Sequence, residues 1–145
     1  MDFFNRLFVA LTEVHPTHPM IVHFPIALTG AAFLFILLAY WKKSASLEQA
    51  AFANISLAAV STLFAGITGY IDNINNYVGD APNAGAKILL ATVLLLLTGG
   101  ISITRYRNPA MFQKSHPILY AGVYGLSFAI ALVLAFLGGV ILYGF

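Results

Sequence analysis

The chain contains no cysteine and very little charge. Only 8% of its 145 residues are Asp, Glu, Lys or Arg, whereas about a quarter are charged in a typical soluble domain. The lack of cysteine excludes disulfides, thiolate zinc sites, cysteine-ligated iron–sulfur clusters and covalently attached haem. The few basic residues form no stripe, which argues against nucleic-acid binding. Any cofactor must therefore be held through imidazole, carboxylate, carbonyl or thioether groups.

Hydrophobic residues, in contrast, make up 60% of the chain, and the mean hydropathy is +0.87. Four stretches without formal charge each approach or exceed the about 17 to 25 residues that a helix needs to cross about 30 Å of hydrocarbon. The sequence thus predicts an all-α integral membrane protein, a four-helix transmembrane bundle in a single domain over residues 1–145. The predicted helices cover residues 19–41, 50–71, 87–104 and 117–143.

The segment before the first span is amphipathic. Its apolar residues recur at helical spacing, at Phe3, Phe4, Leu7, Phe8 and Leu11. This pattern predicts a short interfacial helix along the outer membrane surface. A helix packed on a neighbouring subunit fits the pattern equally well.

The basic residues predict the orientation of the bundle. Five of the seven fall in the first and third connections between spans, namely Lys42, Lys43, Arg105, Arg107 and Lys114. The positive-inside rule makes that side cytoplasmic, so we expect a multi-pass protein of the cytoplasmic membrane with both termini outside.

Three of the four histidines, His15, His18 and His23, lie at the outer mouth of the first span, and His116 falls on the inner side. An ionisable residue inside a span is a functional candidate by default and usually faces the bundle interior, which we expect of His23. His18 is about 140° from His23 around a helix, so the two do not share a face while both are helical. The alternative interpretation makes His18 and His116 polar helix-start residues and His15 a solvated loop residue.

Asp72 closes the second span on the same outer side as these histidines. It is a candidate to accept a hydrogen bond from His18 or His23, or to bind a metal together with His15, His18 and His23. A solvated carboxylate at a helix end is the plain alternative.

A haem b site in a membrane bundle usually needs two imidazoles at the same depth. His116 lies at the opposite membrane face from His23, about 30 Å away, and the second and third spans contain no histidine. One chain alone cannot easily supply both ligands. His23 and His18 remain the candidate cofactor ligands, through a homodimer, a partner subunit, or a transition-metal site that includes Asp72.

Residues 18–27 read HPMIVHFPIA, which resembles the signature of small bacterial and archaeal membrane proteins grouped as domain of unknown function 2231. Residues 69–72 and 138–144 extend the resemblance to most of the chain. The resemblance implies a four-helix transmembrane module that in relatives accompanies redox domains such as cytochrome c or Rieske proteins. Family members often carry a further histidine near the start of the third helix, where this chain has Lys87.

Two functional hypotheses follow. The first is a redox-associated membrane subunit, active near electron transfer, with haem or a metal at its outer histidines and a cytochrome or other redox partner. The second is a structural or accessory subunit of a larger complex, or a homo-oligomer, without a cofactor of its own. A transporter is less favoured because paired broken helices are lacking. Autonomous catalysis is disfavoured too, since no nucleophile, base and orienting group can be placed together.

Overall fold

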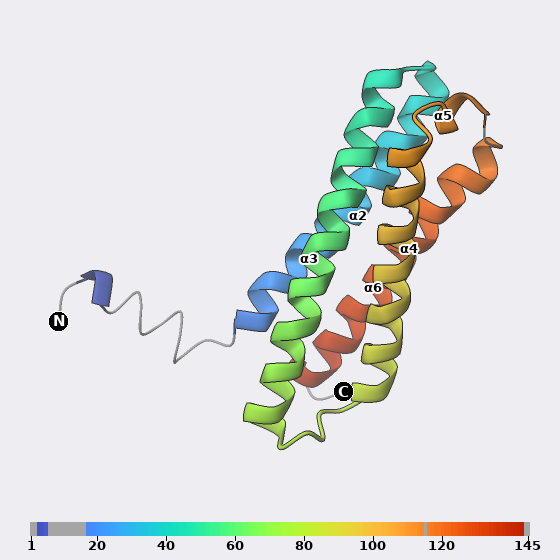
Figure 1. The fold of residues 1–145 in the computed structure, drawn as a ribbon. Coiled ribbons are helices and arrows are strands. Elements are labelled where there is room, and N and C mark those ends of the chain that lie inside the picture. Colours follow the sequence, from blue (N-terminus) through green and yellow to red (C-terminus); the bar gives the residue numbers. More distant parts are fainter. Residues whose placement is uncertain (1–2, 6–16, 115, 144–145) are drawn as a thin grey trace.

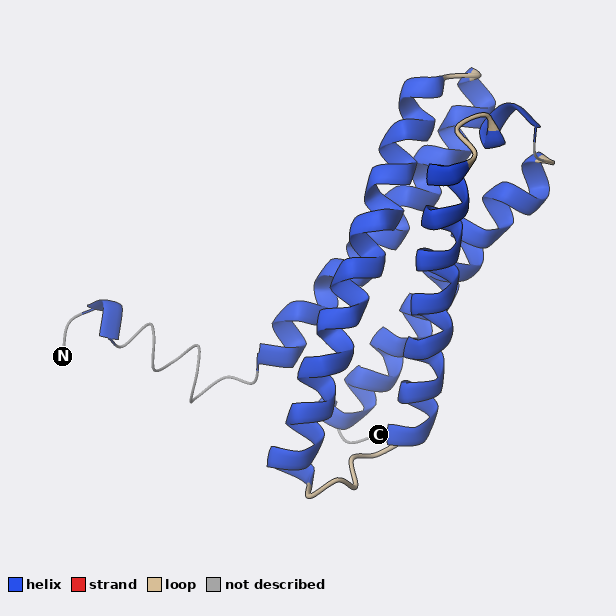
Figure 2. Ribbon diagram, viewed as in Figure 1, coloured by secondary structure: helices blue, strands red, loops and turns tan. Residues whose placement is uncertain are grey.

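The computed structural model describes residues 3–5, 17–114 and 116–143, and its regular structure within these ranges is entirely helical (Figure 2). Four helices are long and apolar enough to cross a membrane. They are α2 (Thr17–Lys42), α3 (Ala45–Tyr77), α4 (Ala84–Arg107) and α6 (Pro117–Tyr143), and the single-turn helix α5 (Met111–Lys114) precedes α6. The predicted all-α membrane fold is confirmed.

The four long helices run alternately up and down and pack side by side as a bundle (Figure 1). Helix α2 packs against α3 and α6, and α4 closes the arrangement by packing against the same two helices. The α2–α3 connection and the α4–α6 connection lie at one end, which we call the basic end because it carries Lys42, Arg105, Arg107 and Lys114. The start of α2 and the α3–α4 loop lie at the other end, called the histidine end.

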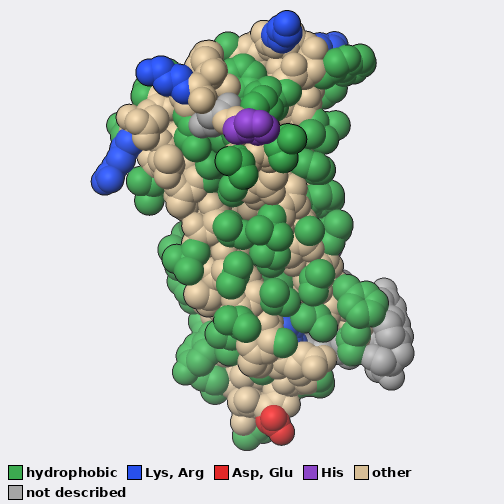
Figure 3. Space-filling model, turned by 90° about the vertical axis from the view of Figure 1, so that its right-hand side faces the viewer, with side chains coloured by type: hydrophobic (Ala, Val, Ile, Leu, Met, Phe, Trp, Pro, Cys, Tyr) green, Lys and Arg blue, Asp and Glu red, His purple; other side chains and the backbone are tan. Residues whose placement is uncertain are grey.

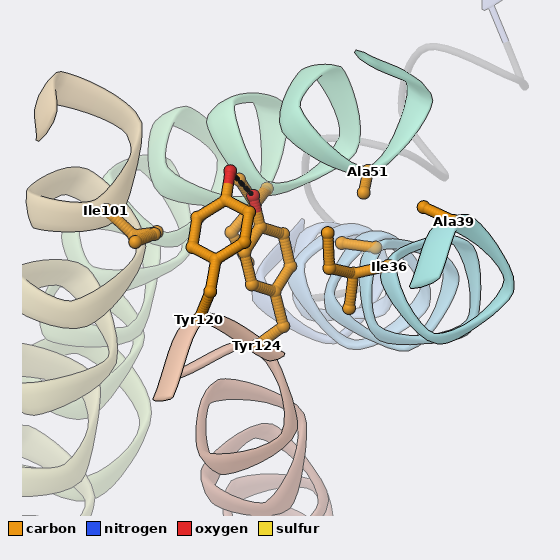
Figure 4. Close-up of a cluster of buried hydrophobic side chains, with 8 residues drawn as sticks. Ile36, Ala39, Ala51, Ile101, Tyr120 and Tyr124 are labelled. Atoms are coloured by element: carbon orange, nitrogen blue, oxygen red, sulfur yellow. Dashed lines mark hydrogen bonds between the residues drawn. The ribbon is translucent and has the colours of Figure 1, made fainter. Parts of the chain in front are cut away.

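Each helix buries one narrow stripe of side chains whose positions are alternately three and four residues apart. This spacing is typical of helices that cross at about 20°. The stripes are Pro25, Thr29, Ala32, Ile36 and Ala39 on α2; Glu48, Ala51, Ile55, Ala58, Thr62 and Ala65 on α3; Leu94, Thr98 and Ile101 on α4; and Tyr120, Tyr124, Ser127 and Ala131 on α6. A cluster of these side chains fills the bundle toward the basic end (Figure 4).

Each stripe contains one buried serine or threonine, whose hydroxyl is satisfied inside its own helix. Thr29, Thr62, Thr98 and Ser127 all donate to the carbonyl oxygen four residues earlier, at 2.7 to 2.8 Å. These polar groups therefore lie in the core without an unmade hydrogen bond.

Gly30 on α2 and Gly125 on α6 each leave space for a phenylalanine ring of the other helix, so the two helices can pack closely. A Cβ on Gly30 would lie 3.0 Å from Phe128, and a Cβ on Gly125 would lie 2.9 Å from Phe33. Gly-x-x-Phe thus occurs once on each helix, and each ring packs onto the other helix's glycine, with 6.3 Å between the ring centroids.

Helix α3 extends beyond the predicted 50–71 in both directions. It begins at Ala45, where Ser44 is the N-cap and its side chain accepts a hydrogen bond from the Leu47 amide. It ends at Tyr77, followed by Val78 in the left-handed conformation. Of the N-terminal segment only residues 3–5 are described, and they are helical. The rest of the predicted interfacial helix lies outside the described residues.

Candidate functional site

His18 lies on the inward side of α2 and packs against α3. It is seven residues before Pro25, so it continues the buried stripe by two helical turns. Its ring lies directly over Gly69, because a Cβ at that glycine would come within 2.7 Å of the His18 Cε1 atom. His18 Nδ1 is 3.3 Å from the Thr68 hydroxyl oxygen. Gly69 therefore provides the space that this imidazole occupies.

His18 and His23 differ in how their ring nitrogens are engaged. His18 Nδ1 faces the Thr68 hydroxyl, and the ring also forms a hydrogen bond to the Ala65 backbone. His23 Nδ1 lies 2.5 Å from the Pro19 carbonyl, which can only accept. His23 thus donates through Nδ1–H, and in its neutral ring Nε2 keeps its lone pair. Histidines that bind metals are usually held in this way.

His23 faces away from the bundle, so the expectation that it points into the interior is wrong. It precedes buried Pro25 by two residues, which places it about 200° around the helix from the inward stripe. Its side chain is exposed, as are those of Met20 and Ala27 on the same face. The inward stripe runs toward His18 instead, and the His23 imidazole faces lipid or another chain.

Asp72 lies near His18, together with a residue that the sequence did not single out as part of a site. The charges of Asp72 and Lys87 both act on the His18 ring, so α2, α3 and α4 each contribute one ionisable group at this end. Asp72 also accepts a hydrogen bond from the Asn76 side chain. In the described part of the chain, no three His, Asp or Glu side chains are close enough to hold a metal. Because His15 lies outside that part, the metal site of His15, His18, His23 and Asp72 stays a prediction.

The basic end contains a buried ion pair that sequence reasoning missed. Glu48, on α3, is 1% exposed. Arg105, on α4, donates to it through two nitrogens, Nε to Oε1 at 2.6 Å and Nη2 to Oε2 at 2.8 Å. Tyr120, on α6, donates to the same Oε1 at 2.9 Å. Because the Tyr120 proton is used there, Tyr124 is the donor in the 3.3 Å contact between the two hydroxyls (Figure 4). The network joins three helices.

The sequence did contain a signal for this pair. Glu48 stands in the series 48, 51, 55, 58, 62 and 65, which is the three-and-four spacing of the buried α3 residues. Arg105 continues the α4 series 94, 98 and 101. A helix that begins at residue 50 places Glu48 in a connection, and the positive-inside rule treats Arg105 only as a topology signal. The stripe, followed to the helix ends, would have placed both charges inside.

Comparison with known proteins gives one match. Residues 14–145 match a protein family described as "Predicted membrane protein (DUF2231)". The matched range includes all four long helices and both clusters of polar residues described above. The chain has no match among curated proteins or among solved structures.

Proposed function

Since the chain belongs to the DUF2231 family of predicted membrane proteins, we propose that it is a redox-associated membrane subunit whose histidine end supplies imidazole ligands to haem b or a transition metal. One observation carries the proposal. His23 donates Nδ1–H to the Pro19 carbonyl, and its Nε2 makes no hydrogen bond in the described part of the chain. An imidazole fixed at Nδ1 is prepared to bind a metal through Nε2.

The cofactor site is shared between chains. His18 packs against α3 while His23 is exposed on the outer face of α2, so His23 is the outward imidazole of this end within residues 17–114. A lone imidazole facing hydrocarbon is unfavourable, which favours a partner at His23. A second copy related by two-fold symmetry, or a different redox subunit such as a cytochrome, would provide the other axial ligand.

The chain's own residues hold and orient this ligand. The Pro19 carbonyl fixes the tautomer of His23, and the following helix keeps the imidazole at a constant depth. Haem iron, when bound, supplies one-electron redox chemistry. For a transition metal, His18 and Asp72, with His15, would be the ligands, and Lys87 would then influence the charge of the site.

The second candidate is a structural or accessory subunit without a cofactor. It is favoured because the polar side chains that face the bundle interior already make contacts between helices. The His18 imidazole lies between α2 and α3, and Glu48 joins α3 to α4 and α6.

The first test is the visible spectrum of the detergent-purified chain, oxidised and dithionite-reduced, with metal analysis and with titration of added haemin. We expect a Soret band, or a stoichiometric metal, that is lost in His23→Ala. His116→Ala is the matched control, because it removes an exposed histidine at the opposite end, and it should leave the signal unchanged.

A chain that is colourless, metal-free and unable to bind added haemin would overturn the cofactor proposal and leave the accessory role. The same conclusion would follow if His23→Ala and His116→Ala reduced the signal equally, because the binding would then be independent of the histidine end.

A further inference from the structure

A pocket of about 420 Å³ opens beside the buried ion pair at the basic end. It lies between α4, α5 and α6 and is lined by Ile101, Met111, His116, Leu119, Tyr120 and Val123. Its volume is within the range of small-molecule sites, about 300 to 1,000 Å³. The face drawn in Figure 3 has hydrophobic side chains over its middle, Lys and Arg side chains at one end, and a histidine near that end. The pocket opens on the outer surface of the bundle, because Leu119 in its lining is exposed.

The lining of the pocket is apolar and carries no formal charge apart from the titratable His116. Ile101, Met111, Leu119 and Val123 provide aliphatic and thioether surface. The Tyr120 hydroxyl is already engaged with Glu48 and Tyr124. Arg105, which lies one helical turn after Ile101 on α4, is paired with Glu48.

Among the residues that line the pocket, His116 has the polar side chain that is available to bind a ligand. Its side chain is exposed at the start of α6 and makes no hydrogen bond to any described residue. A neutral imidazole has one N–H donor and one acceptor. An apolar pocket with one such group at its edge matches the usual composition of a small-molecule site, in which few polar groups orient an apolar body.

We propose that this pocket binds the ring of a membrane-soluble quinone, with the His116 N–H donating to one quinone carbonyl. A quinone is flat and uncharged, its oxygens only accept hydrogen bonds, and its apolar tail can remain in the bilayer. An anionic lipid headgroup would instead require Lys or Arg side chains in the lining, and none is present there. The site lies at the opposite end from His23 and does not depend on the proposed cofactor.

The test is equilibrium dialysis of the detergent-solubilised chain against ubiquinone-1. We expect saturable binding of one quinone per chain. His116→Ala should weaken it by about three- to tenfold, as expected for one hydrogen bond, and His116→Gln, which retains an N–H donor, should weaken it less.

Two substitutions at exposed positions test the location without disturbing the core. Leu119, which lines the pocket, is 72% exposed, and its neighbour Ile118, outside the lining, is 76% exposed. We expect Leu119→Trp to block binding and Ile118→Trp to leave it intact. His23→Ala should also leave it intact, so failure of the cofactor proposal and failure of this one can be distinguished.

The quinone proposal is overturned if ubiquinone-1 does not bind saturably, or if Leu119→Trp and His116→Ala bind it as the unmodified chain does. It is also overturned if phosphatidylglycerol binds saturably and displaces the quinone, and this binding is lost in the same two variants. That result would assign the pocket to an anionic lipid.

Discussion

Glu48 is the residue whose environment differs most from what its chemistry would suggest. A carboxylate buried in a membrane bundle is stable only when its charge is matched and its oxygens accept hydrogen bonds. Both conditions are met, because Arg105 binds both oxygens and the Tyr120 hydroxyl binds one of them. The planar guanidinium suits this two-point contact, which a lysine ammonium cannot reproduce. The cost of burial is therefore offset only while all three helices stay in place.

We expect Glu48→Gln to destabilise the bundle by about 3 kcal/mol, because Arg105 then remains as an unpaired charge in an apolar setting. Equilibrium unfolding in mixed micelles measures this change. A second substitution, Arg105→Met, should restore most of the stability of Glu48→Gln, because it removes the unpaired charge. Arg107→Gln is the control, since Arg107 is exposed on the same last turn of α4. Equal stability of Glu48→Gln and Arg107→Gln would contradict the structural role of the pair.

At the level of helices, the contact between α2 and α6 depends on two small residues. The glycine of each Gly-x-x-Phe receives the ring of the other helix, so the contact is reciprocal. In lipid no hydrophobic effect drives helices together, and close packing at small residues provides the attraction. Phe33 and Phe128 therefore help to determine how far apart α2 and α6 lie.

Gly125→Ala tests this contact, because its new Cβ would be 2.9 Å from the Phe33 ring. The ring must then move, and we expect a loss of about 1 to 3 kcal/mol relative to the matched variant. That variant is Gly122→Ala on the same helix, where a Cβ meets nothing within 4 Å. Both variants replace a glycine of α6 by alanine and so raise the helix propensity equally. The difference between their free energies of unfolding therefore reports the packing against Phe33. If the two variants are equally stable, the contact does not hold the helices together.

Much of the helical layout could be predicted from the sequence, because long uncharged stretches determine which segments cross a membrane. The helix ends were less predictable. At the C-terminal end of α3, for instance, Asn73 accepts hydrogen bonds from the Gly79 and Ala81 amides of the following loop. Side-chain direction was the harder part. The sequence places His18 and His23 in one cluster, but His18 lies in line with the buried stripe of α2 whereas His23 lies on the opposite, exposed face.

The whole molecule is asymmetric in charge along its length. The basic end carries Lys42, Lys43, Arg105, Arg107 and Lys114, whereas Asp72 and Asp80 lie toward the histidine end. Arg105 is neutralised by Glu48, so four of these basic residues remain to interact with the membrane surface.

The 33 residues of α3 span about 50 Å, which exceeds the hydrocarbon thickness of about 30 Å. Helix α3 must therefore tilt or extend beyond the hydrocarbon at one or both ends.

This asymmetry predicts that the basic end faces the cytoplasm. The chain has no cysteine, so single cysteines can report its orientation without background. Ala45 and Asn75 are exposed near opposite ends of α3. In intact cells a membrane-impermeant maleimide should label Asn75→Cys, whereas Ala45→Cys should react only after permeabilisation. The reverse pattern would place the histidine end inside, and a haem or metal bound there would then exchange electrons with cytoplasmic partners.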